Sequence, residues 1–213
     1  MSDFSTRRVM MVDTQVRPSD VTKFPIIAAM LAVPRERYVP DAQQEAAYAG
    51  WNVTLSPNRV VLEARSLAKL LDFLDLVPGE RVLDLAAGYG YAAAVLAEMG
   101  CDVVAVEEDA AMAEAGRTRL AGKARMVTAA LTTGAPDQGP YDAIVIQGAV
   151  EQIPDAILAQ VKDGGRIGAL FMQGALGIAR IGLKQGGVVT WRSVFNATAP
   201  VLPGFAAKRG FVL

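Results

Sequence analysis

A short glycine-rich segment is the part of the sequence best suited to chemistry. Asp84 lies in the apolar run Val82–Leu85, and Gly88 and Gly90 follow directly before a helix-like stretch. Glycine lets a ligand approach the backbone closely, and a helix start offers N–H groups without partners. Glu107 ends the next apolar run. In a parallel sheet these strand ends are neighbours, so the acidic side chain could accept hydrogen bonds from both hydroxyls of a ribose.

Two ligands compete for this turn. Residues 88–93 satisfy G-x-G-x-x-A, the dinucleotide fingerprint. Asp84 followed by Ala86, Gly88 and Gly90 instead resembles the acidic-x-G-x-G-x-G signature of class I S-adenosylmethionine-dependent methyltransferases, with Ala86 at the first glycine. A structural turn without a ligand is the third interpretation. Asp84 favours the sulfonium cofactor, because a buried carboxylate needs a cationic group nearby and would repel a pyrophosphate.

Composition excludes several classes of protein. The 213 residues include no histidine and a single cysteine, Cys101. This excludes Ser–His and Cys–His catalytic pairs, an internal disulfide and a zinc site built on His or Cys, so no metal is expected. The 21 Lys and Arg balance 22 Asp and Glu, which leaves no basic excess for nucleic-acid phosphates. With no apolar segment near the roughly 20 residues of a membrane span, we expect a soluble cytoplasmic protein without membrane contact.

Apolar runs alternate with helix-like stretches in the second part of the chain. Runs that are apolar on both faces are typical of parallel strands covered on both sides. The last two runs flank Gly186-Gly187, which predicts an antiparallel hairpin. We therefore predict an α/β fold with a doubly wound, mostly parallel sheet and a C-terminal hairpin. The predicted strands are residues 82–85, 103–106, 124–128, 141–146, 166–171, 177–185 and 188–195.

The first part of the chain is expected to be helical. Helices are predicted over 3–15, 19–32 and 41–49, followed by a loop over 50–60 and a helix from Leu62. We expect residues 1–77 to form a helical N-terminal region with a substrate loop. Residues 78–213 would form the ligand-binding α/β domain, and the two parts would make one compact unit.

The order of motifs resembles the protein-L-isoaspartate (D-aspartate) O-methyltransferase family over roughly residues 7–170. A divergent member would be a Rossmann-like methyltransferase that uses S-adenosylmethionine and acts on a protein or peptide with a free carboxylate. The oligomeric state stays open. The matching segments are Met11–Arg17, Val33–Pro40 with Ala47-Tyr48, Val82–Ala97, Pro140–Ile144, and Pro154–Leu158 with Gln160 and Gly164–Ile167.

The resemblance also marks departures from the family pattern. Where the family carries Gly-Gln-Thr-Ile-Ser, this chain has Arg59–Glu63, so a glutamate replaces the serine at the junction of cofactor and substrate. Where the family has Gly-Asp-Gly, this chain has Thr128–Ala130, and the aspartate that would reach the adenine is missing. The cofactor residues implied by the resemblance are Asp84, Ala86, Gly88, Gly90, Glu107, Ala130 and Gln147.

Arg59 and Glu63 are the candidate substrate-binding residues, and no catalytic residue is singled out. Arg59 could hold a substrate carboxylate or could be a solvated loop cation. Glu63 could bind a cationic group, act as a base, or simply favour a helix start.

The missing histidine is compatible with carboxyl methylation, because a carboxylate is already ionised and needs no base. Three other hypotheses stay open. They are a catalytically degenerate homologue that binds only cofactor or partner, a methyltransferase for another acceptor, and a nicotinamide-dependent oxidoreductase.

Overall fold

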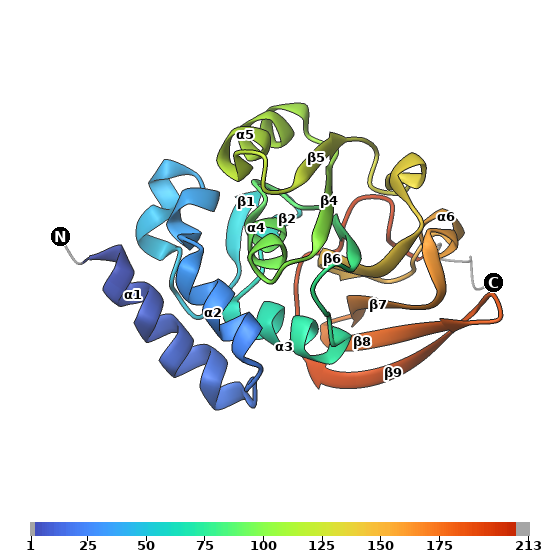
Figure 1. Cartoon of the computed structure of the whole chain (residues 1–213), viewed down its shortest axis with the longest axis horizontal. Helices are drawn as coiled ribbons and strands as arrows, with labels where there is room; N and C mark the ends of the chain where they lie inside the picture. Colours follow the sequence, from blue (N-terminus) through green and yellow to red (C-terminus); the bar gives the residue numbers. More distant parts are fainter. Residues whose placement is uncertain (1–2, 208–213) are drawn as a thin grey trace.

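A seven-stranded sheet forms the centre of the computed structural model, which describes residues 3–207. Its order is β5-β4-β3-β6-β7-β8-β9, and the first five of these are parallel. The antiparallel strands β8 and β9 extend one edge, as the C-terminal hairpin prediction required (Figure 1). The strands are β3 (Arg81–Leu85), β4 (Asp102–Glu107), β5 (Arg125–Thr128), β6 (Tyr141–Val150), β7 (Val161–Gln173), β8 (Leu176–Gln185) and β9 (Val188–Asn196).

Both faces of the sheet are covered, because successive residues of each parallel strand point to opposite sides. Val82 and Val103 join a core that includes buried residues of the N-terminal helices, α3 and α4, whereas Leu83 and Val104 join a core that includes α6 and the C-terminal segment. The predicted doubly wound sheet is confirmed. The helices are α1 (Phe4–Met11), α2 (Phe24–Ala32), α3 (Ala64–Leu74), α4 (Tyr91–Glu98), α5 (Ala110–Leu120) and α6 (Asp155–Ala159).

Two predictions for the N-terminal part are wrong in detail. The second helix begins at Phe24, not at residue 19, and Pro25 sits in its first turn, where its missing N–H costs nothing. The predicted helix over 41–49 is a 3-10 helix, Asp41–Ala46. Figure 1 shows these segments on one side of the sheet, away from the β8–β9 hairpin.

The predicted loop over 50–60 is also wrong, because most of it is a hairpin of two short strands. These are β1 (Val53–Ser56) and β2 (Arg59–Val61), joined at Pro57-Asn58. Val53 pairs with Val61 and Thr54 with Val60, but Ser56 pairs with Arg59, so Leu55 is the extra residue of a β-bulge. The bulge turns Leu55 toward the glycine turn, where its Cδ1 lies 2.5 Å from the place of a Cβ built on Gly88.

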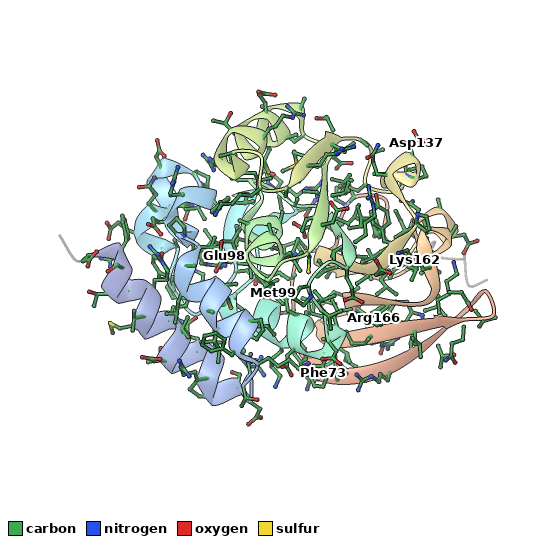
Figure 2. All side chains as sticks on the ribbon, in the orientation of Figure 1. Phe73, Glu98, Met99, Asp137, Lys162 and Arg166 are labelled. Atoms are coloured by element: carbon green, nitrogen blue, oxygen red, sulfur yellow. The ribbon has the colours of Figure 1, made fainter. Side chains whose placement is uncertain are left out.

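Figure 2 places Phe73 and Arg166 where α3 meets the sheet. Arg166 of β7 donates to the Leu74 carbonyl at 2.8 Å and pairs with Glu80 at 2.7 Å. Glu80 directly precedes β3, so the two contacts of Arg166 together tie α3 to the amino ends of the parallel strands. The opposite ends of those strands are left to the glycine turn and its neighbours. Within residues 3–207, no helix is long and apolar enough to cross a membrane.

Candidate active site

Glu107 organises the carboxyl edge of the sheet. It is fully buried at the end of β4. Its Oε2 accepts the backbone N–H of Gly88 at 2.9 Å, and its Oε1 accepts those of Glu108 at 2.9 Å and Asp109 at 3.1 Å. Because β3 and β4 are parallel neighbours, the turn after β3 reaches the end of β4. The prediction that the Gly88 turn and Glu107 meet at one edge is confirmed.

The backbone of the turn explains its small residues. Gly88 has φ +58° and Gly90 has φ +91°, both in the left-handed region that glycine enters at little cost. Gly90 also has α5 close by, since a Cβ there would lie 3.0 Å from Leu120. Ala86 adopts φ +64°, so it takes the conformation of the glycine it replaces and carries the strain of a side chain there.

Asp84 is buried beside this turn with half of its carboxylate unpaired. Its Oδ1 accepts the Gln147 Nε2–H at 2.8 Å, and its Oδ2 has no partner. Burial raises the pKa of Asp84 to about 7, against the opposing effect of the Gln147 hydrogen bond, and the charge of Glu107 raises it further. Asp84 is therefore a proton-holding group near neutral pH.

Arg59 forms an ion pair with Glu107 and does not line the cavity that contains Glu63. Its Nε is 3.2 Å from Glu107 Oε1, and its side chain is only 5% exposed, so it is not a solvated loop cation. Its second partner is Glu108, at 2.6 Å and 36% exposed. The two candidate substrate residues, Arg59 and Glu63, are thus not brought together. Arg59 covers the acid at the end of β4.

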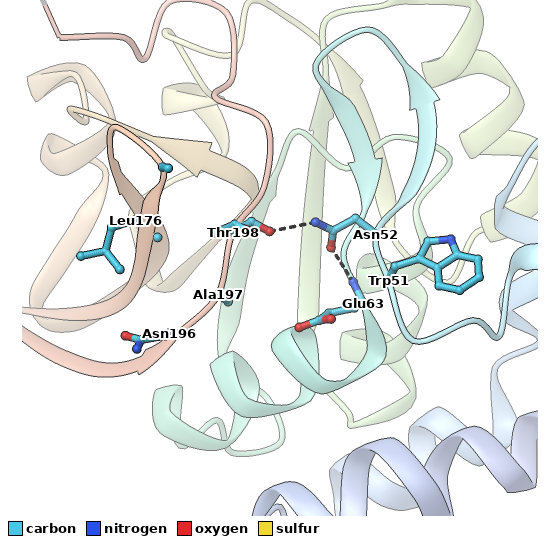
Figure 3. A pocket seen from close by; sticks show the side chains of 9 residues that line it. Trp51, Asn52, Glu63, Leu176, Asn196, Ala197 and Thr198 are labelled. Carbon is cyan, nitrogen blue, oxygen red and sulfur yellow. Dashed lines mark hydrogen bonds between the residues drawn. The ribbon is translucent and has the colours of Figure 1, made fainter.

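Glu63 lines a cavity of about 410 Å³ between the N-terminus of α3 and the end of β9. Its carboxylate accepts Ser66 Oγ–H at 2.6 Å and lies 3.7 Å from the Arg65 guanidinium. Figure 3 shows this carboxylate on the same side as Asn196, whereas the indole of Trp51 points away. Glu63 therefore stands at the N-cap of α3 without a side-chain hydrogen bond to the helix backbone, and its carboxylate faces the cavity. The lining residues are Trp51, Asn52, Glu63, Ala175, Leu176, Gly177, Asn196, Ala197 and Thr198.

Two residues that the sequence reasoning missed hold this cavity in place. Asn52 accepts the Glu63 N–H at 2.8 Å and donates to the Thr198 carbonyl at 2.8 Å, so it joins the two walls. Arg35 is fully buried and donates to the Leu62 carbonyl at 2.7 Å, just before Glu63. Neither role has a local sequence signal, because each contact joins segments far apart in the chain.

The adenine-side candidates lie at the end of β5. The Ala129 N–H donates to the Glu107 carbonyl at 3.2 Å, which places this segment beside the acid. Ala130 is exposed and its carbonyl accepts the N–H groups of Thr133 and Gly134. Its side chain offers a ligand only apolar contact. Among the described residues, no cluster of three or more His, Cys, Asp or Glu could hold a metal ion.

Comparison with solved structures supports the fold. One match, described as a protein-L-isoaspartate O-methyltransferase, has a TM-score of 0.79 at 20% identity and covers 95% of this chain and 66% of that chain. A second, from Plasmodium falciparum and in complex with S-adenosyl-L-homocysteine, is also described as a protein-L-isoaspartate O-methyltransferase. It has a TM-score of 0.77 at 15% identity and covers 95% and 99% of the two chains.

Comparison of sequences shows the family as well as the fold. A protein-L-isoaspartate O-methyltransferase of Methylorubrum extorquens (strain PA1) is 39% identical over 168 residues, which are 78% of this chain and 74% of the relative. One of Herpetosiphon aurantiacus is 37% identical over 172 residues, 78% and 77% of the two chains. The family model for protein-L-isoaspartate(D-aspartate) O-methyltransferase matches residues 8–172. The chain belongs to the protein-L-isoaspartate(D-aspartate) O-methyltransferase family.

Proposed function

We propose that this chain transfers the methyl group of S-adenosylmethionine to a free carboxylate of a damaged, isoaspartyl-containing protein in the cytoplasm, as a repair step. The observation that supports this most is the meeting of Asp84, Gly88 and Glu107 at one edge of the sheet in a chain of this family. That edge is where ligands bind in open α/β sheets. The family match also decides against the nicotinamide-dependent interpretation of the turn.

The residues of the turn fit the cofactor. Glu107 would accept the ribose hydroxyls, and Gly88 has no side chain that would keep a ligand from its backbone. The unpaired Oδ2 of Asp84 and the Gln147 amide beside it are polar groups next to the same edge. When bound, the cofactor supplies an electrophilic methyl group on a sulfonium. The hydrogen-bonding groups of these residues match those of the cofactor. In the conformation described, however, Arg59 is paired with Glu107 and Leu55 lies against Gly88.

The Glu63 cavity is the proposed acceptor site. It lies at the start of α3, where the resemblance places the junction of cofactor and substrate. Asn52 and Arg35 hydrogen-bond to the backbone at Glu63 and Leu62, and so hold the start of α3 in place beside the cavity. A carboxylate acceptor is already a nucleophile at neutral pH. The protein therefore has only to align acceptor and methyl group, a contribution that can reach about 7–11 kcal/mol.

Methyl transfer to an isoaspartyl peptide tests the function directly, with the matching aspartyl peptide as control. We expect transfer to the isoaspartyl peptide only. The protein alone should also melt at a higher temperature with S-adenosylhomocysteine and not with NAD. Transfer to neither peptide, with the melting shift intact, would favour another acceptor or a degenerate homologue. A shift with NAD alone would contradict the proposed cofactor.

Glu63→Ser is expected to raise the rate on the isoaspartyl peptide. Two like charges about 4 Å apart repel by about 4 kcal/mol at an effective dielectric of about 20. The Glu63 side chain is 26% exposed and lies 3.7 Å from Arg65, so the net penalty is smaller. We expect a gain of about tenfold in kcat/KM, which corresponds to about 1.4 kcal/mol.

Glu63→Gln is the matched control, because it removes the charge and keeps the shape. A similar gain in both variants would assign the effect to charge, and a gain with serine alone would assign it to the hydroxyl. High activity of the unchanged protein that falls with serine would contradict the repulsive interpretation.

A further inference from the structure

The β1–β2 hairpin carries two side chains into the cofactor edge of the sheet. Leu55 lies against Gly88, and Arg59 is paired with Glu107. Gly88 of the turn and Glu107 at the end of β4 are the two residues that a ribose-containing ligand needs free. The Glu107 side chain has no exposed surface in this arrangement. The β1–β2 hairpin therefore obstructs the glycine turn through the packing of Leu55, and it occupies the Glu107 carboxylate through the ion pair with Arg59.

The local backbone aims both side chains at this edge. Leu55 is the extra residue of the bulge, and bulges re-aim a side chain and are frequent next to functional sites. Asn58 at the tip takes φ +61°, which closes the tight turn that returns the chain to Arg59. Val53 and Val61 at the base are buried, whereas Pro57 and Asn58 at the tip are exposed. The base is therefore anchored in the core, and the tip is the part that can move.

Arg59 can move away from Glu107 without leaving either charge buried and unpaired. Glu107 keeps three backbone N–H donors, from Gly88, Glu108 and Asp109. Arg59 keeps Glu108, whose carboxylate is already 2.6 Å away and 36% exposed. Both partners of the buried pair thus have other polar contacts in place, so separating them leaves neither charge buried without a partner.

We propose that the tip of the β1–β2 hairpin is a plug of the cofactor site, in which Arg59 holds the place of the ribose on Glu107 and must be displaced before the cofactor binds. This inference rests on the proposed use of S-adenosylmethionine. Arg59 is a gating residue here and not a substrate ligand. Binding of the cofactor shifts the hairpin tip toward an open state by replacing the guanidinium on Glu107 with ligand hydroxyls.

Calorimetric titration of the full-length protein with S-adenosylhomocysteine tests the plug without any turnover. Arg59→Met removes the competing charge, and we expect binding about tenfold tighter or more, because the ligand no longer has to break a charge-assisted contact. Leu55→Ala opens the Gly88 side and leaves the Arg59–Glu107 pair intact, so it should also bind more tightly. Both variants are first checked for a cooperative melting transition.

Arg166→Met is the matched control, since it removes the arginine of the partly buried pair with Glu80 at the far end of the strands. Its affinity should equal that of the unchanged protein. Equal, measurable affinity in all four proteins would overturn the plug and leave the cofactor assignment standing. Weaker binding by Arg59→Met would overturn the plug and make Arg59 a cofactor contact. Binding by none of them would overturn the plug and the proposed cofactor together.

Discussion

Asp84→Asn is expected to make the fold more stable than the unchanged protein at about pH 8 and no more stable at about pH 4. The buried carboxyl has its pKa raised from 3.8 to about 7, chiefly by burial. Between those values the folded state holds a proton that the unfolded state has lost. The stability of the unchanged protein therefore falls as pH rises through this window, and asparagine removes that fall.

The size of the effect follows from the shift. One pKa unit corresponds to about 1.4 kcal/mol, so the unchanged protein loses up to about 4 kcal/mol of unfolding free energy between about pH 4 and pH 8. Urea unfolding at both pH values measures the difference. Asparagine keeps an oxygen for the Gln147 hydrogen bond, which limits other changes.

Asp75→Asn is the control for general effects of charge removal. Asp75 is exposed, and its pKa is lowered by the hydrogen bond and charge of Lys23. Its contribution to stability is present above its usual pKa and is lost only as pH falls through the lowered one, below the window tested here. A variant of Asp84 with the same pH dependence as the unchanged protein would contradict the assignment of the titration to Asp84.

The parallel part of the fold could be predicted because its signal is local. Buried parallel strands appear as short apolar runs, such as residues 103–106, and glycine follows β3 where the backbone needs positive φ. The end of β6 and the start of β7 are harder to predict from the sequence. β6 runs to Val150 and β7 begins at Val161, where pairing between strands and not side-chain polarity sets the limits.

The site could be predicted only where its residues follow two adjacent parallel strands, because the ends of such strands lie side by side. Glu107 and Gly88 were found because adjacent parallel strands bring them together. The contact of Arg59 with Glu107 crosses 48 sequence positions and depends on a hairpin with strands of only four and three residues. Such strands are too short for a period-2 pattern to emerge, so residues 50–60 had the composition of a loop.

Glu107→Gln is expected to destabilise the fold much more than Arg59→Met. Removing one partner of a buried ion pair typically costs about 3–5 kcal/mol, because the other charge stays buried. Here we expect the stability losses of Glu107→Gln and Arg59→Met to be unequal. Glutamine keeps one oxygen and gains an NH₂ facing N–H donors, so at least one of the three backbone N–H groups around Glu107 loses its acceptor. Arg59 then retains Glu108 as its ion-pair partner and the Asn58 carbonyl as an acceptor. Methionine instead leaves Glu107 with all three backbone donors.

The double variant Arg59→Met, Glu107→Gln completes the cycle, with unfolding free energies measured in urea at one pH. We expect about 3 kcal/mol for Glu107→Gln, about 1 kcal/mol for Arg59→Met, and a double variant less destabilised than their sum by about 1–2 kcal/mol. Strict additivity would mean that the two side chains do not interact in solution. A larger loss from Arg59→Met would mean that the backbone donors cannot hold Glu107 alone, and the hairpin tip would then be a fixed part of the fold. The expected order instead follows from a carboxylate that the backbone of the β4 end already satisfies, with the arginine as a replaceable partner.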